Sequence, residues 1–94
     1  MLNVTKPALG RLSRKLARNE AADDVALRFT RREGGWTLGP DRARPGDVTF
    51  AHDGRNVLLL DAAVSQGMSD LTLDVRKTEA GPRLRLHRNA NQQD

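Results

Sequence analysis

The sequence predicts an α+β domain that is mostly antiparallel β, a twisted sandwich or partial barrel with an N-terminal amphipathic helix and one short second helix. Two observations predict this class. Several short segments alternate apolar and polar residues with the period of two that is typical of strands. One early segment, Lys6 to Arg18, instead spaces its leucines as a helix does. The length of 94 residues allows one domain with a modest core, expected over residues 1–88, before a disordered polar tail at 89–94.

The N-terminal region predicts a short strand followed by the longer helix. Leu2 to Val4 is the expected strand, Thr5 is a suitable N-cap, and Pro7 fits the first helical turn, where its missing N–H is no loss. The apolar stripe of the helix consists of Leu9, Leu12 and Leu16. We therefore expect this helix to cover one face of the main sheet.

A β-hairpin between Gly46 and Asp61 is the strongest local signal. Asp53-Gly54 readily supplies the positive φ angles of a type I′ turn. A two-residue turn predicts three cross-strand pairs: His52 with Arg55, Phe50 with Val57, and Val48 with Leu59. The last two pairs would form a core face. Leu58 and Leu60 would then point to the other face, under the helix.

The remaining elements are shorter. Strands are expected at Val25–Arg31, Trp36–Leu38, Leu71–Val75 and Arg83–His87, and a short helix at Ala62–Gln66 between Asp61 as N-cap and Gly67. Gly39 to Gly46 contains two prolines and predicts a loop.

Composition excludes several classes of chemistry. The chain has no cysteine, which excludes disulfides, thiolate nucleophiles and thiolate metal sites. Its longest apolar run, Val57 to Leu60, is far too short to span a membrane. The N-terminus lacks the plan of a signal peptide, so we expect a cytoplasmic protein without a membrane partner. Sixteen basic residues against twelve acidic ones give a net charge of +4.

Metal, cofactor and enzyme sites are not predicted. The candidate metal ligands are scattered: His52, His87, Asp47, Asp53 and Asp61. Neither histidine lies in an HxH or HExxH spacing, so we expect no metal and no cofactor. No serine lies in a G-x-S-x-G elbow. A small hydrolase or isomerase using His52 is the least favoured hypothesis, and we expect no enzymatic activity.

Arginines on two strands suggest an anion-binding face. Arg28, Thr30 and Arg32 share one strand face, and Arg83, Arg85 and His87 share another. If these strands were neighbours, their outward sides would form a basic stripe for nucleic acid or another polyanion. The alternative is a solvated face on which Asp74 offsets part of the charge. The candidate anion- or partner-binding residues are Arg28, Arg32, Arg83 and Arg85.

Taken in order, several blocks of the chain resemble the HesB/IscA-type family of iron–sulfur carrier domains. The blocks are Leu2–Ala8, Ala26–Arg28, Gly46-Asp47, the segment Asp53–Asp61 and Leu71–Val75. The resemblance covers nearly the whole ordered chain, about residues 2 to 86. The resemblance implies a compact, mostly-β domain with helices against it, and a protein that often forms dimers.

The resemblance also implies three cluster-binding cysteines, one after an early strand and two as Cys-x-Cys near the C-terminus. Here Arg32–Trp36 occupies the first region, and no Cys-x-Cys follows Leu86. Since thiolates are the chief ligands of such clusters, we expect a domain that has lost cluster ligation. Its expected role is accessory, through an unidentified protein partner, with homodimerisation left open. The alternative is a basic module that binds nucleic acid or another polyanion.

Overall fold

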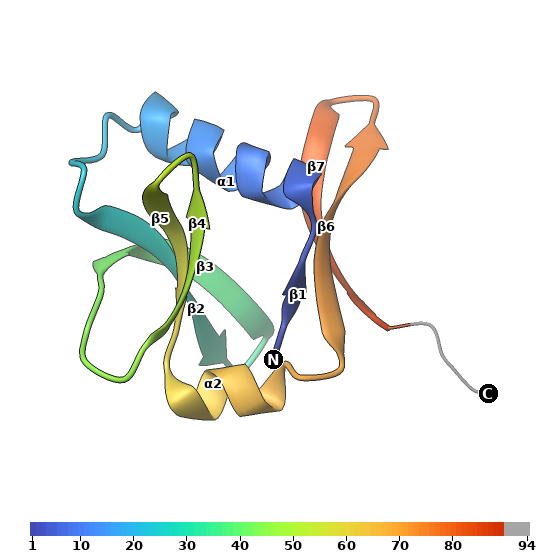
Figure 1. The fold of residues 1–94 in the computed structure, drawn as a ribbon. Coiled ribbons are helices and arrows are strands. Elements are labelled where there is room, and N and C mark those ends of the chain that lie inside the picture. Colours follow the sequence, from blue (N-terminus) through green and yellow to red (C-terminus); the bar gives the residue numbers. More distant parts are fainter. Residues whose placement is uncertain (90–94) are drawn as a thin grey trace.

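The computed structural model describes residues 1–89, which form two β-sheets and two helices (Figure 1). The four-stranded sheet has the order β3-β2-β5-β4 and the three-stranded sheet the order β1-β6-β7. The elements are β1 (Asn3–Val4), α1 (Lys6–Arg18), β2 (Val25–Arg32), β3 (Gly35–Arg42), β4 (Val48–His52), β5 (Arg55–Leu60), α2 (Ala62–Gly67), β6 (Leu71–Thr78) and β7 (Gly81–Arg88). Antiparallel pairs predominate, with parallel pairing of β1 to β6 and β2 to β5. The predicted α+β class is confirmed.

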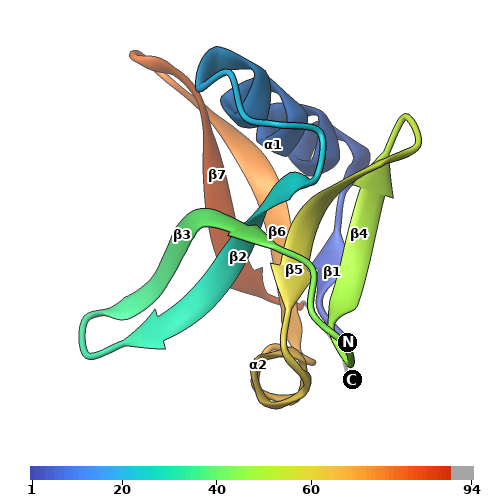
Figure 2. The ribbon, with the colours of Figure 1, turned by 90° about the vertical axis from the view of Figure 1, so that its left-hand side faces the viewer.

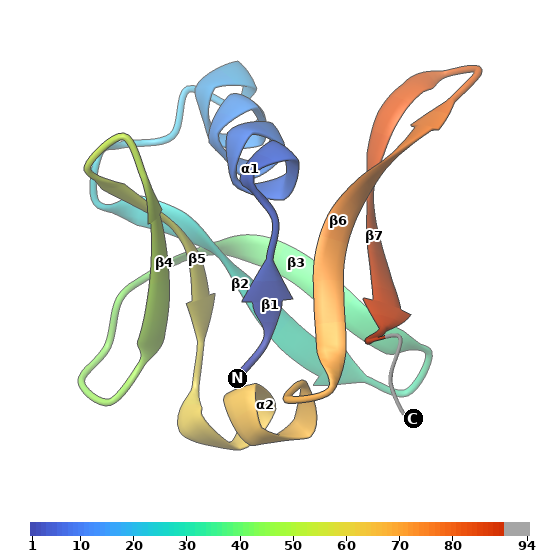
Figure 3. The same cartoon turned by 45° about the vertical axis from the view of Figure 1, so that its right-hand side comes forward.

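The core lies between the two sheets. In Figure 1, α1 runs across the top of both sheets and α2 closes the opposite end. Side chains from three elements, α1, β5 and β6, are almost fully buried there, namely Leu12, Leu16, Leu58, Leu60 and Leu73. Figure 3 shows β1 in front of this space, beside β6. No helix among residues 1–89 is long and apolar enough to cross a bilayer.

The predicted helix Lys6–Arg18 and its cap are confirmed. Thr5 has extended backbone angles, and its hydroxyl oxygen accepts a hydrogen bond from the Ala8 N–H at 3.3 Å. The same hydroxyl donates to Asp74 Oδ1 on β6 at 2.8 Å. Because one side chain begins the helix and contacts the neighbouring strand, it fixes α1 against the three-stranded sheet.

The hairpin turn is confirmed, but the predicted register is wrong beyond its first pair. Asp53 and Gly54 both have positive φ angles, 52° and 80°, and His52 pairs with Arg55. A bulge between Phe50 and Ala51 then shifts the pairing by one residue, so that the observed pairs are Phe50 with Leu58, Thr49 with Leu59, and Val48 with Leu60. A bulge places two residues of one strand against one of its partner.

The shift changes which side chains share a face. Val48 and Phe50 lie on the same face as Leu60 and Leu58, and all four contact the core beneath α1. Leu59 is fully buried on the opposite face, beside its parallel partner Arg28. The expectation that α1 covers Leu58 and Leu60 holds.

Strand β3 corrects the predicted loop at Gly39 to Gly46. It continues through Pro40 to Arg42, with Pro40 opposite Leu27. Proline cannot donate a ladder hydrogen bond, and it is tolerated here because β3 is an edge strand. Figure 2 shows β3 at the side of the four-stranded sheet, extending away from α1.

The short helix is confirmed, and the last two strands are longer than predicted. The Asp61 side chain accepts a hydrogen bond from the Val64 N–H at 2.8 Å, as an N-cap does, and α2 runs to Gly67. Strands β6 and β7 extend to a tight turn at residues 79–80. Most of the tail predicted at 89–94 lies outside the described residues; the N–H of Asn89 donates to Asp70 O at 2.9 Å.

Candidate functional site

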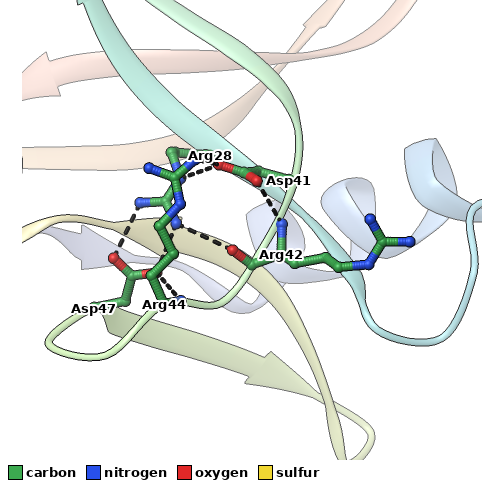
Figure 4. A network of polar contacts seen from close by, with 5 residues as sticks. All are labelled: Arg28, Asp41, Arg42, Arg44 and Asp47. Carbon is green, nitrogen blue, oxygen red and sulfur yellow. Dashed lines mark hydrogen bonds and ion pairs between the residues drawn. The ribbon is translucent and has the colours of Figure 1, made fainter.

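A network of hydrogen bonds and ion pairs centres on Arg28, on the outer face of the four-stranded sheet (Figure 4). Its Nη1 and Nη2 atoms donate to the two carboxylate oxygens of Asp47, at 3.0 and 2.6 Å. Its Nε donates to Asp41 Oδ2 at 2.7 Å, and Nη2 also donates to the Arg42 carbonyl at 3.3 Å. The Arg28 and Asp47 side chains are only 10% and 4% exposed. Because the Arg28 guanidinium is largely shielded from water, these four hydrogen bonds take the place of hydrogen bonds to water.

Hydrogen bonds lower the pKa of both carboxylates. The pKa of Asp47 falls mainly because Arg28 donates to it, with a further bond from the Arg44 backbone N–H. The pKa of Asp41 falls mainly because the Arg42 backbone N–H donates to it, and then because Arg28 does. The same partners raise the pKa of the Arg28 guanidinium. The cluster therefore stays ionised and closes the loop between β3 and β4 onto β2.

This cluster removes Arg28 from the predicted basic stripe. Its guanidinium is committed to Asp41 and Asp47, so it offers no free charge to an anion. Sequence reasoning missed the pairing, although Gly46-Asp47 and Ala26–Arg28 were two of the blocks that carried the resemblance. Each block supported the resemblance to the family. The contact between the two blocks could not be predicted, because it depends on how residues 29–46 fold between them.

The other predicted arginines lie apart. Arg32 is exposed at the end of β2, whereas Arg83 and Arg85 are exposed on β7, in the other sheet. The condition for a single stripe, neighbouring strands, is not met. The cross-strand partner of Arg85 is Asp74, whose pKa is lowered mainly by the hydrogen bond from Thr5 and then by the Val75 N–H. Anion binding by Arg32, Arg83 and Arg85 stays a prediction.

The histidines do not converge with other ligands. His52 Nε2 lies 3.4 Å from Asp53 Oδ2, but the Asp53 side chain is 91% exposed. A cleft of about 460 Å³ beside this turn is lined by Gly54, Arg55 and Asn56, and not by His52. Within residues 1–89 no three His, Asp or Glu side chains are grouped closely enough to hold a metal ion. A catalytic role for His52 would need this side chain in a concave pocket with a second polar group, and His52 does not line this cleft.

An apolar cleft lies where the resemblance implies cluster ligands. The two regions are the β2–β3 turn and the C-terminal end of β7, and Trp36 and Leu86 belong to their borders. Both line a cleft of about 270 Å³ between the sheets, together with Phe29, Leu38, Leu73 and Leu84. Phe29 and Trp36 meet edge to face at 6.5 Å, and the Arg31 guanidinium lies 5.2 Å from the Trp36 ring centre. None of these six side chains offers a thiolate, imidazole or carboxylate ligand, so they do not fit an iron–sulfur cluster.

The fold is shared with solved structures of iron–sulfur cluster proteins. The structure is similar to that of Escherichia coli SufA, which is involved in biosynthesis of iron–sulfur clusters. The TM-score is 0.72 at 19% sequence identity, covering 93% of this chain and 84% of SufA.

Two further solved structures agree. IscA with a [2Fe-2S] cluster matches with a TM-score of 0.61 at 19% identity, over 94% of this chain and 85% of IscA. A protein from Aquifex aeolicus, solved by NMR in solution, matches at 0.64 and 21% identity, over 92% and 89% of the two chains. No family model and no curated protein sequence matches the chain. The predicted HesB-like fold is confirmed at the level of structure.

Proposed function

We propose that this protein is a non-catalytic, cysteine-free version of the HesB/IscA-type fold that binds no cluster and acts through contacts with other proteins. The observation that carries the proposal is the apolar cleft lined by Trp36 and Leu86, in a fold shared with SufA and IscA. We place its role in or beside iron–sulfur cluster maturation, in the cytoplasm. A protein partner, including a second copy of the chain, is the expected ligand.

Burial supports this reading of the cleft. A protein that retained a weakened cluster site would keep some soft or anionic ligands there. Instead the edge-to-face contact of Phe29 with Trp36 fills the space near the β2–β3 turn. Aromatic pairs of this kind contribute about 0.5–1.5 kcal/mol beyond the area they bury. The Phe29–Trp36 contact therefore contributes to stability, and the side chains that line the cleft include no His, Asp or Glu.

Anaerobic reconstitution with ferrous iron and sulfide tests the loss of ligation. IscA, whose solved structure contains a [2Fe-2S] cluster, is the positive control when treated in the same way. After gel filtration we expect this protein to show no absorbance at about 400–420 nm from sulfide-to-iron charge transfer, and no bound iron or sulfide. A stable chromophore with stoichiometric iron and sulfide would refute the proposal.

Affinity capture from the native lysate, followed by mass spectrometry, tests the role in protein contacts. We expect iron–sulfur assembly proteins to be retained by this protein and not by an unrelated domain of equal net charge. Nuclease treatment of the lysate separates this outcome from the alternative, because retention through nucleic acid would be lost. Capture that vanishes after nuclease treatment would contradict the proposal and favour the polyanion-binding module.

A further inference from the structure

Charge is distributed very unevenly along the chain. Helix α1 and the strands β6 and β7 with their turn carry ten Lys and Arg residues and only two acids, Asp74 and Glu79. Residues 19–70 carry nine acids against six basic residues. The ten cations are Lys6, Arg11, Arg14, Lys15, Arg18, Arg76, Lys77, Arg83, Arg85 and Arg88. In Figure 1, α1 lies directly beside the β6–β7 hairpin, so the two basic segments are neighbours.

The basic segments are not neutralised internally. The ion pairs among the described residues all lie between residues 24 and 53. Of the two local acids, Asp74 accepts hydrogen bonds from Thr5 and Val75. Glu79 lies in the exposed hairpin turn. Two cations, Arg76 and Arg83, are direct cross-strand partners, an arrangement that costs stability unless an anion lies nearby.

A cleft of about 450 Å³ lies between α1 and the hairpin. Its charged lining consists of Arg11, Lys15 and Arg83, without a carboxylate, and its apolar lining includes Leu38 and Leu84. Arg11 is half-buried, and its Nε atom is buried without a hydrogen-bond partner among the described residues. A buried donor without a partner is unfavourable, so the Arg11 side chain gains from an acceptor that reaches it.

A second, almost wholly apolar groove continues from this cleft. It has a volume of about 310 Å³ and shares Arg11 and Pro82 with the basic cleft, and its other lining residues include Pro7 and Val75. We propose that the basic cleft and this groove together bind a protein segment in which carboxylates alternate with apolar residues. The carboxylates would accept hydrogen bonds from Arg11 and Arg83, and the apolar side chains would lie against Pro7, Val75 and Pro82.

An acidic protein segment fits this surface better than nucleic acid. Single-stranded nucleic acid gains much of its affinity by stacking bases on aromatic side chains. No aromatic residue lines either cleft, and Trp36 is occupied by Phe29 and Arg31. The apolar surface beside Arg11 and Arg83 is instead suited to a peptide that carries both carboxylate and apolar side chains.

A labelled peptide of about ten residues that alternates Glu and Leu tests the site. The readout is the ¹⁵N NMR spectrum of the full chain, in which each arginine Nε–Hε group gives its own signal. We expect the Arg11 Nε–Hε signal to shift on binding, together with the amides of Gly10 and Val75. Arg11→Gln and Arg83→Gln should each weaken binding about tenfold, since each removes a charged hydrogen bond.

Arg18→Gln is the matched control, because it removes the same charge from an exposed residue of α1 that lines neither cleft, and it should leave binding unchanged. A peptide of the same length that alternates Lys and Leu should not bind. Four results would overturn the inference: an unmoved Arg11 signal, equal weakening by Arg18→Gln, the same shifts with inorganic phosphate alone, or tighter binding of an oligonucleotide of equal charge.

This inference rests on the proposed function, because it names the surface and chemistry of a protein partner. The two can fail separately. If Arg11→Gln still captures the same proteins from lysate, the cleft is not the contact surface and the proposed function stands. If reconstitution yields a stoichiometric cluster, the proposed function fails whatever the peptide does.

Discussion

At the scale of single residues, the pairing of Arg28 with Asp47 is the contact on which the outer face of the four-stranded sheet depends. Arg28 follows the apolar residues Ala26 and Leu27, and alternation alone assigned it to solvent. The side chain does point away from the core, but Asp41 near the end of β3 and Asp47 in the loop between β3 and β4 both accept hydrogen bonds from it. Strand periodicity gives the direction of a side chain, whereas the covering loop decides its exposure.

Replacing Asp47 with asparagine should destabilise the fold by about 3 kcal/mol, because it leaves the largely buried Arg28 guanidinium short of its main counter-charge. Urea unfolding at neutral pH measures the change. Asp24→Asn is the control, since Asp24 pairs with Arg42 through side chains that are 64% and 66% exposed, and it should barely move the midpoint. Equal effects of the two substitutions would contradict the assigned role.

The Asp47 pair also predicts how this difference depends on pH. The hydrogen bonds from Arg28 hold the pKa of Asp47 below its usual value, so the folded state favours the ionised form. The stabilisation is complete above the unfolded pKa of about 3.9 and is lost as the pH falls through the lower folded value. Wild type and Asp47→Asn should therefore differ most at neutral pH and converge below about pH 4.

At the scale of elements, local signals predicted the helices well and the long strands less well. Thr5, Pro7 and the leucine stripe fixed both ends of α1, because capping and periodicity act within a few residues. The hairpin turn was also local, but no pattern in the sequence marked the bulge at Phe50 and Ala51. Likewise Pro40 continues a strand only because β3 is at an edge, a position that the order of the chain does not reveal.

Thr5 connects two elements, so its removal should cost more than the loss of a cap alone. Thr5→Ala deletes the acceptor for the Ala8 N–H and the donor to Asp74. We expect a loss of about 2 kcal/mol, the sum of a cap and one further hydrogen bond. Chemical denaturation measures it, with Thr5→Ser as the control, because serine retains both bonds. A serine variant as unstable as the alanine variant would show that the methyl group matters instead.

At the scale of the whole molecule, the two sheets are joined by packing and not by a shared ladder. Among the described residues no strand of one sheet pairs with a strand of the other. The leucines of α1 and β5 fill the space between them. The sequence predicted these leucines as core, yet the charged and apolar clefts beside α1 could not be predicted, because they arise from the placement of the β6–β7 hairpin against that helix.

Leu12 lies fully buried at this junction. Leu12→Ala should destabilise the protein by about 3 kcal/mol through lost transfer energy and the cavity it leaves. The half-buried Leu9 on the same helix is the matched control, and Leu9→Ala should cost clearly less. Unfolding followed by circular dichroism would measure both. Two separate transitions in the Leu12 variant would contradict a common core for the two sheets.

The separation of charge between the helix–hairpin side and the rest of the chain gives the molecule a permanent electric dipole moment. An approaching negatively charged surface would exert a torque on such a molecule before any side chains touch. The productive orientation would then be reached during diffusion, and encounters would slow as ionic strength rises.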